Sequence, residues 1–94
     1  MAENAMLASA GVSSVFIGRK PAAIYLAKVI TLLAEGREVL IVARGRFILK
    51  AISVAVKAAK ATNCDCQVVI GEEVLSMDGE RPVPKIEIRL VKTG

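Results

Sequence analysis

A strand that runs directly into a helix is the feature that most constrains how this chain can fold. Residues 39–42 form an unbroken apolar run, Val-Leu-Ile-Val, which is typical of a central strand covered on both faces. After residues 43–46 (Ala-Arg-Gly-Arg) the period of the sequence changes. Polar side chains then recur every three or four residues, as expected for one stripe along a helix. They are Arg46, Lys50, Ser53, Lys57 and Lys60.

The rest of this predicted helix is apolar around most of its circumference, which is more than packing on one sheet can hide. The whole chain is 94 residues long and 54% hydrophobic. A domain this small buries a limited core and is left with an apolar surface that needs a partner. We therefore expect a homodimer. The predicted interface residues are Phe47, Leu49, Ile52 and Val56.

Basic residues are concentrated in one part of the chain. Residues 18–60 contain nine Lys or Arg residues and two Glu, within a net charge of +4 for the whole chain. Residues 39–60 contain no acidic residue, so the helix lacks the alternating charges of an ordinary solvated face. A solvated basic face is the simpler interpretation of the stripe, but positive charge without acidic neighbours favours a polyanionic partner.

The remaining segments predict one α/β (α+β) domain in the order βαβαββ. Residues 14–17 form a strand, and Pro21 opens a helix that runs to Glu35 and is stopped by Gly36. Two further strands cover 66–73 and 85–92. A hairpin at Asp78-Gly79 joins the last two strands. The first two strands, linked through a helix, should be parallel.

We therefore expect a two-layer sandwich, with two helices on a mixed four-stranded sheet. Residues 1–12 are predicted to be a flexible tail and residues 13–94 a single domain.

No apolar run has the roughly 18 residues needed to span a bilayer, so we expect a cytoplasmic protein.

Two basic loops follow the two predicted parallel strands. Gly18, Arg19 and Lys20 precede the first helix, whose N-terminal N–H groups and dipole favour phosphate. Arg44 and Arg46 occupy the turn before the second helix. Parallel strands end at the same edge of a sheet, so these four cationic side chains should line one rim.

Evidence for catalysis is weak. The chain has no His, which excludes Ser-His and Cys-His nucleophiles. Glu72, Glu73, Asp78 and Glu80 cluster near the predicted hairpin. They could act as an acid/base pair or metal ligands, but a charged strand edge explains them more simply. We predict that the protein is not an enzyme and has no cofactor.

The two cysteines are Cys64 and Cys66. Their spacing does not favour a disulfide with each other, and without His they provide at most half of a zinc site. We expect two buried thiols at the start of a strand. An intermolecular disulfide is the alternative.

Four segments in order resemble the Alba family of small archaeal chromatin and RNA-binding proteins. They are residues 16–21 (FIGRKP), 32–36 (LLAEG), 43–46 (ARGR) and 86–88 (IEI). The resemblance covers nearly the whole chain from Val15. It implies the fold of the C-terminal domain of bacterial translation initiation factor three, and dimers formed through the second helix and the later strands.

The resemblance also implies sequence-independent binding of double-stranded DNA, and often RNA, on the chromosome or nucleoid. The implied nucleic-acid contacts are Gly18, Arg19, Lys20, Arg44, Arg46, Lys50 and Arg81. The family's reported acetylation position falls on Arg19, which cannot be acetylated, so Lys20 is the candidate modification site. In some members an aromatic residue links dimers into larger assemblies. Here a residue near Thr62 stands in its place, so the resemblance implies a dimer but leaves assembly of dimers on DNA as an open alternative.

Three other functions are consistent with the sequence. The same basic surface could bind a structured RNA, as a ribonucleoprotein subunit does. The loop at 18–21 could hold a phosphorylated small molecule in an enzyme. A purely structural oligomer would use the apolar helix alone.

Overall fold

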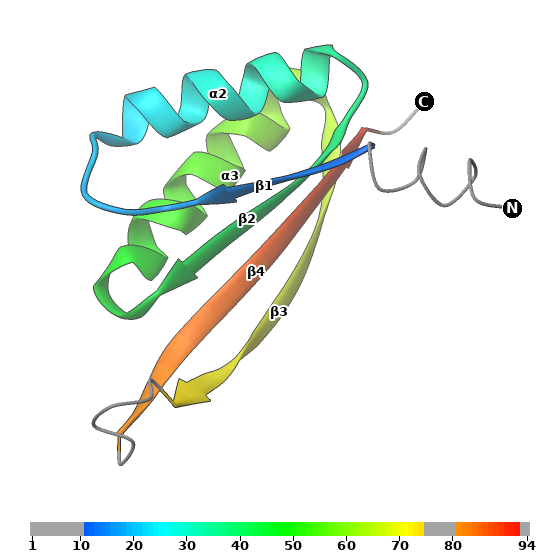
Figure 1. Cartoon of the computed structure of the whole chain (residues 1–94). Helices are drawn as coiled ribbons and strands as arrows, with labels where there is room; N and C mark the ends of the chain where they lie inside the picture. The colour runs from blue at the N-terminus through cyan, green and yellow to red at the C-terminus, as the bar shows by residue number, and fades with distance from the viewer. Residues whose placement is uncertain (1–10, 75–80, 93–94) are drawn as a thin grey trace, which may run out of the picture.

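The chain forms four strands and two helices in the predicted order (Figure 1). The computed structural model describes residues 11–74 and 81–92. Most of the predicted tail, 1–12, and the predicted Asp78-Gly79 turn lie outside these residues. The elements are β1 (Val12–Phe16), α2 (Ala22–Ala34), β2 (Glu38–Arg44), the 3₁₀ turn η1 (Gly45–Phe47), α3 (Ile48–Thr62), β3 (Cys64–Val74) and β4 (Pro82–Lys92).

The four strands form one mixed sheet in the spatial order β1-β2-β4-β3. β1 pairs with β2 in parallel, with Val15 opposite Ile41. β4 is antiparallel to both of its neighbours, β2 and β3. The α+β class, the parallel pair and the central position of β2 are therefore confirmed.

Both helices pack on the same face of the sheet (Figure 1). The core lies between the two layers, where Val39, Ile41 and Ala43 of β2 are buried together with Val54 of α3. No helix among the described residues covers the other face of β2, yet the prediction of a strand covered on both faces holds at Val42. On the open face Val42 is still only 4% exposed, because the adjacent strands flank it on both sides.

Backbone conformation sets the limits of the helices. α2 follows Pro21, and Gly36, with a φ of 85°, turns the chain just after the helix ends. α3 begins at Ile48 rather than Arg46, because Gly45 takes a φ of 57° and starts the 3₁₀ turn. It ends at Thr62, and Asn63 follows as a left-handed cap with a φ of 62°. Neither helix among the described residues is long and apolar enough to cross a membrane.

The β3–β4 pair extends beyond the rest of the sheet as an arm (Figure 1). β2 ends where Arg44 lies opposite Lys85, while β3 and β4 continue to pair as far as Val74 and Pro82. Beyond Lys85, β4 has a neighbour on one side only, so Pro82 and Pro84 are tolerated in the strand. The arm leaves the sheet at the end where β1 and β2 also finish.

Candidate nucleic-acid interface

The first basic loop, residues 18–21, lies between β1 and α2. Arg19 and Lys20 have exposed side chains. The backbone N–H groups of Gly18 and Lys20 donate to the hydroxyl of Tyr25, at 2.9 and 3.3 Å. A Cβ atom at Gly18 would lie 3.3 Å from the same hydroxyl oxygen. Glycine at this position therefore lets the loop close tightly over Tyr25.

The second basic loop is the 3₁₀ turn η1, which joins β2 to α3. Arg46 is exposed, and its guanidinium carbon lies 5.0 Å from the centre of the Phe47 ring. Phe47 itself is partly buried and packs against the core. This cation–π geometry places the Arg46 guanidinium over a ring that the core supports.

Lys50, in the first turns of α3, connects the two loops. Its ammonium group donates to the carbonyl oxygens of Gly18 and Lys20, at 2.7 and 2.8 Å. It also lies 5.6 Å from the centre of the Phe47 ring. Arg46 and Lys50 therefore share one aromatic ring, and Lys50 ties that ring to the first loop. The structure places both loops side by side at the carboxyl ends of β1 and β2.

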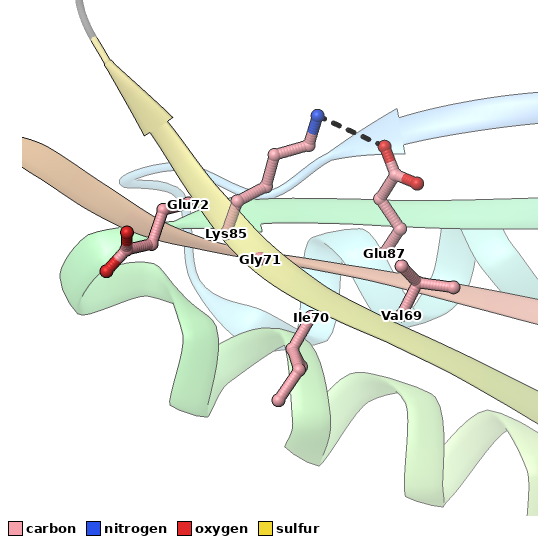
Figure 2. Close-up of a pocket in the computed structure, with 6 residues that line it drawn as sticks. All are labelled: Val69, Ile70, Gly71, Glu72, Lys85 and Glu87. Carbon is pink, nitrogen blue, oxygen red and sulfur yellow. Dashed lines mark ion pairs between the residues drawn. The ribbon is translucent and has the colours of Figure 1, made fainter.

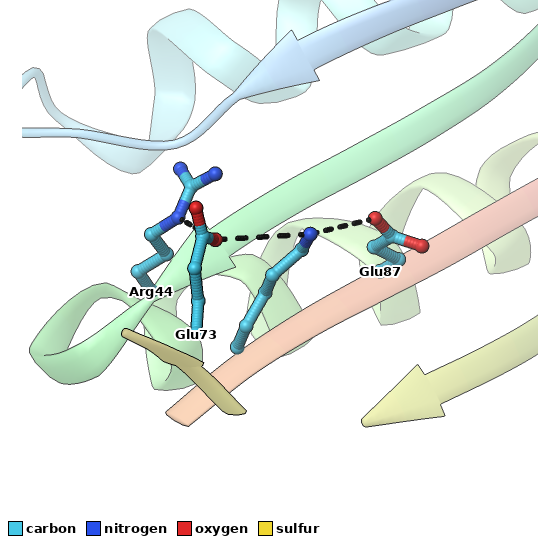
Figure 3. A network of polar contacts seen from close by, with 4 residues as sticks. Arg44, Glu73 and Glu87 are labelled. Carbon is cyan, nitrogen blue, oxygen red and sulfur yellow. Dashed lines mark hydrogen bonds and ion pairs between the residues drawn. The ribbon is translucent and has the colours of Figure 1, made fainter. Parts of the chain in front are cut away.

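Arg44 lies apart from the other loop cations. As the last residue of β2, it alternates with the buried residues Ile41 and Ala43 and so points to the open face of the sheet. Its Nε atom donates to Oε1 of Glu73 at 2.7 Å, as Figure 3 shows. Lys85 continues this network, with Nζ 3.8 Å from Glu73 Oε1 and 3.2 Å from Glu87 Oε2.

The hydrogen bond from Arg44, together with the positive charges of Arg44 and Lys85, lowers the pKa of Glu73. A carboxyl group with a lowered pKa favours the folded state at neutral pH, and this contribution is lost only as the pH falls below the ordinary value near 4.5. Glu73 is therefore a permanent negative charge beside Arg44 under physiological conditions.

A shallow recess of about 140 Å³ lies beside Gly71 on β3 (Figure 2). The recess exists because Gly71 has no side chain to fill it. Lys85, opposite Gly71 on the neighbouring strand β4, extends along the recess toward Glu87. The carboxylates of Glu72 and Glu87 also line the recess. Two carboxylates with one lysine do not favour an anion here, so the recess gives no support to a phosphate site.

The cations divide into two groups according to their partners. On the sheet, Arg44, Lys85 and Arg89 each pair with a carboxylate. Within residues 11–74 and 81–92, no carboxylate pairs with Arg19, Lys20 or Arg46. The loop cations are therefore available to an external anion, as are Lys28, Lys57 and Lys60 on the helices, and what distinguishes the loop cations is that they lie together at one end of the sheet. Arg81, which precedes β4, is exposed at the far end of the arm, away from the rest of the sheet.

An apolar groove of about 240 Å³ runs between α3 and β3. Ile52 and Val56 are 40% and 47% exposed and line it, facing Val68, which is 55% exposed. Leu49, on the same helix, is 78% exposed. Of the four predicted interface residues, these three lie at the surface, whereas Phe47 is partly buried under Arg46 and Lys50.

The prediction of two buried thiols is wrong for Cys66. Cys64 is partly buried, with its sulfur 3.0 Å from the Thr62 hydroxyl, but Cys66 is exposed in the single chain and lines the groove. The reason is that β3 is an edge strand that α3 covers incompletely. Partial burial of the thiol is the main cause that raises the pKa of Cys66. The nearby Cys64 and Asp65 raise it further. Within the described residues, no group of acidic or sulfur ligands could hold a metal ion.

Solved structures similar to this chain include two Alba proteins. Alba from Thermoplasma volcanium matches it with a TM-score of 0.75 and 29% sequence identity, over 85% of this chain and 100% of that one. ALBA1 from Trypanosoma brucei matches with a TM-score of 0.69 and 28% identity, over 85% of this chain and 68% of that one. No protein-family model and no curated protein matches.

The chain shares the fold of these two Alba proteins and resembles them in sequence, which supports an Alba-family assignment. Its four-stranded mixed sheet and two helices are the Alba fold. The likeness supports a nucleic-acid-binding member of the family. Which residues bind stays a prediction, as does Lys20 as the modification site.

Sequence reasoning missed two residues that shape this interface. Tyr25 is the only tyrosine, and its position four residues after Pro21 was the available signal, since one helical turn brings it back under the loop. Glu73 was assigned to a solvated strand edge. Its pairing with Arg44 spans 29 residues and depends on strand register, which local sequence patterns do not reveal.

Replacing Glu73 with Gln should strengthen binding to nucleic acid. The substitution removes a negative charge from the guanidinium of Arg44 and frees it for phosphate. We expect affinity for duplex DNA to rise several-fold at low salt, and the slope of log K against log salt to steepen by about 0.9 for each additional phosphate that the protein neutralises. A fluorescence anisotropy titration at several salt concentrations measures both quantities.

The matched control is Glu38→Gln, which removes the partner of Arg89 at the other end of β2. It should leave affinity nearly unchanged. Equal affinities for the Glu73 and Glu38 variants would show that the Arg44–Glu73 pair does not limit binding.

Proposed function

We propose that this protein binds double-stranded DNA as a homodimer, without sequence preference, through contacts to the phosphate backbone. The observation that carries the proposal is the set of loop cations: Arg19, Lys20 and Arg46 have no carboxylate partner among the described residues and lie on two loops that Lys50 joins. The ion pairs on the sheet would have to be broken before their cations could bind phosphate, whereas these three cations need no such step.

Weak sequence discrimination follows from the side chains available. Cations that contact phosphate fix the position of a protein on the duplex but do not read its bases. Aromatic residues make up 3% of the chain, which leaves little for base stacking on single strands. An architectural role on chromosomal DNA, without catalysis, fits these properties.

A second copy of the chain is the proposed occupant of the groove between α3 and β3. Ile52, Val56 and Val68 leave it apolar and open, and exposed apolar patches of this kind mark association surfaces. The family resemblance independently implies a dimer through this helix and these strands. A dimer would also carry two copies of the paired loops and two arms, which doubles the number of phosphates within reach.

Structured RNA is the alternative ligand, because an A-form backbone presents the same phosphate chemistry. Competition between a random duplex DNA and a folded RNA of equal length separates the two. Stronger displacement by RNA would reassign the cellular target while leaving the binding surface unchanged.

Binding should depend steeply on salt. If the dimer contacts about 6 to 10 phosphates, affinity for a random duplex should fall by roughly 10³ to 10⁵ between about 50 and 200 mM salt. Lys20→Met should make the slope shallower by about 0.9 for each phosphate that is no longer neutralised, or about 1.8 per dimer. Anisotropy titrations across this range give the slopes directly.

Lys92→Met is the control for this experiment. Lys92 is exposed at the end of β4, at the edge of the sheet opposite the two loops. Its loss should leave the slope unchanged. A flat salt response of the unmodified protein would exclude phosphate-backbone binding altogether.

Ile52→Asp should convert the dimer to a monomer. The substitution places a charge in the groove, where a second copy would have to bury it without a partner. Light scattering should give the mass of one chain, against two for the unmodified protein. Ile24→Asp is the control, because Ile24 is 52% exposed on α2, outside the groove, and the mass should stay dimeric. A dimeric Ile52→Asp variant would place the interface elsewhere.

A further inference from the structure

We infer that Lys50 is a positioning residue rather than a phosphate contact. Together with Tyr25, it clamps residues 18–20 in the conformation that presents Arg19 and Lys20 to nucleic acid. The inference deepens the proposed function and rests on it, because it assumes that this loop binds phosphate. It assigns to Lys50 a different role from the direct contact that the sequence predicted.

The ammonium group of Lys50 is committed within the protein. A lysine ammonium has three donors, and two of them go to the carbonyl oxygens of Gly18 and Lys20 at 2.7 and 2.8 Å. The same nitrogen lies 5.8 Å from the centre of the Tyr25 ring and 5.6 Å from that of Phe47. Two aromatic rings and two carbonyls therefore surround the charge, and only one of its three donors is left over.

Tyr25 completes the clamp by holding the backbone N–H groups of the loop. Its hydroxyl oxygen accepts from the N–H groups of Gly18 and Lys20. Both backbone donors of these two residues are thus held by Tyr25, and both backbone acceptors are held by Lys50. The loop consequently offers side chains to a ligand, while the amides of Gly18 and Lys20 are already in use.

A loop held in this way is ordered before it meets its ligand. Ordering a flexible segment during binding lowers affinity, and a segment that is already in its bound conformation avoids that loss. Releasing the clamp should therefore weaken binding without changing how many phosphates are neutralised. A direct phosphate contact predicts the opposite pattern, in which the salt slope changes.

Lys50→Arg distinguishes the two roles because it keeps the charge. Arginine binds phosphate at least as well as lysine, but its planar fork does not reproduce a compact ammonium held between two carbonyls. Tyr25→Phe is the second variant. It removes the acceptor from both N–H groups, changes no charge and leaves the ring in place. Lys92→Arg, at the opposite edge of the sheet, is the matched control.

The experiment combines duplex DNA titrations with amide hydrogen exchange of the free protein, measured by NMR. We expect Lys50→Arg and Tyr25→Phe each to weaken binding on the order of tenfold, with the salt slope unchanged. The double variant should bind much like either single variant, because both substitutions release the same loop. Exchange at the Gly18 and Lys20 amides should be faster in both single variants and unaltered in Lys92→Arg.

Full affinity in Lys50→Arg, with unchanged exchange at both amides, would overturn the clamp. So would a Lys50→Met variant whose salt slope falls by the amount expected when a cation no longer reaches phosphate, since Lys50 would then touch the nucleic acid. Failure of the proposed function looks different. In that case the unmodified protein would bind neither duplex DNA nor RNA, while hydrogen exchange would still report whether Lys50 and Tyr25 hold the loop.

Discussion

A single ammonium group holds together the part of the molecule on which nucleic-acid binding would depend. Lys50 on α3 donates to two carbonyl oxygens of a loop that lies 30 and 32 residues earlier in the chain. Since α3 starts directly after the second basic turn, the same two hydrogen bonds fix the first loop relative to the second. These bonds add to the parallel pairing of β1 and β2, which already brings the two loops to the same end of the sheet.

The fold divides the basic residues into two populations with different tasks. On the open face of the sheet, Arg44, Lys85 and Arg89 pair with carboxylates of the same sheet, and the chain Arg44–Glu73–Lys85–Glu87 links β2, β3 and β4 through ion pairs. Cations on the loops have no such partner among the described residues. Net charge alone does not separate these groups. The distinction comes from strand register, which brings Glu73 beside Arg44 and leaves the loops without a carboxylate.

Most of the fold could be predicted from local sequence, because its signals are local. An apolar run followed by a helical period located β2 and α3, and Pro21 and Gly36 marked where α2 begins and ends. The direction of Lys50 could not be predicted in this way, since its place on a polar stripe suggested an exposed side chain. The exposure of Cys66 also depends on tertiary packing, because it reflects how far α3 extends over an edge strand.

The central claim is that both loops meet one duplex at the same time. Chemical-shift mapping by NMR during titration with a random DNA duplex tests it most directly. We expect the amide signals of residues 18–20 and 45–47 to move together at the same DNA concentration, while those near Gly36 and Lys92 stay in place. Shifts confined to one loop, or centred on the opposite end of the sheet, would contradict the proposed interface.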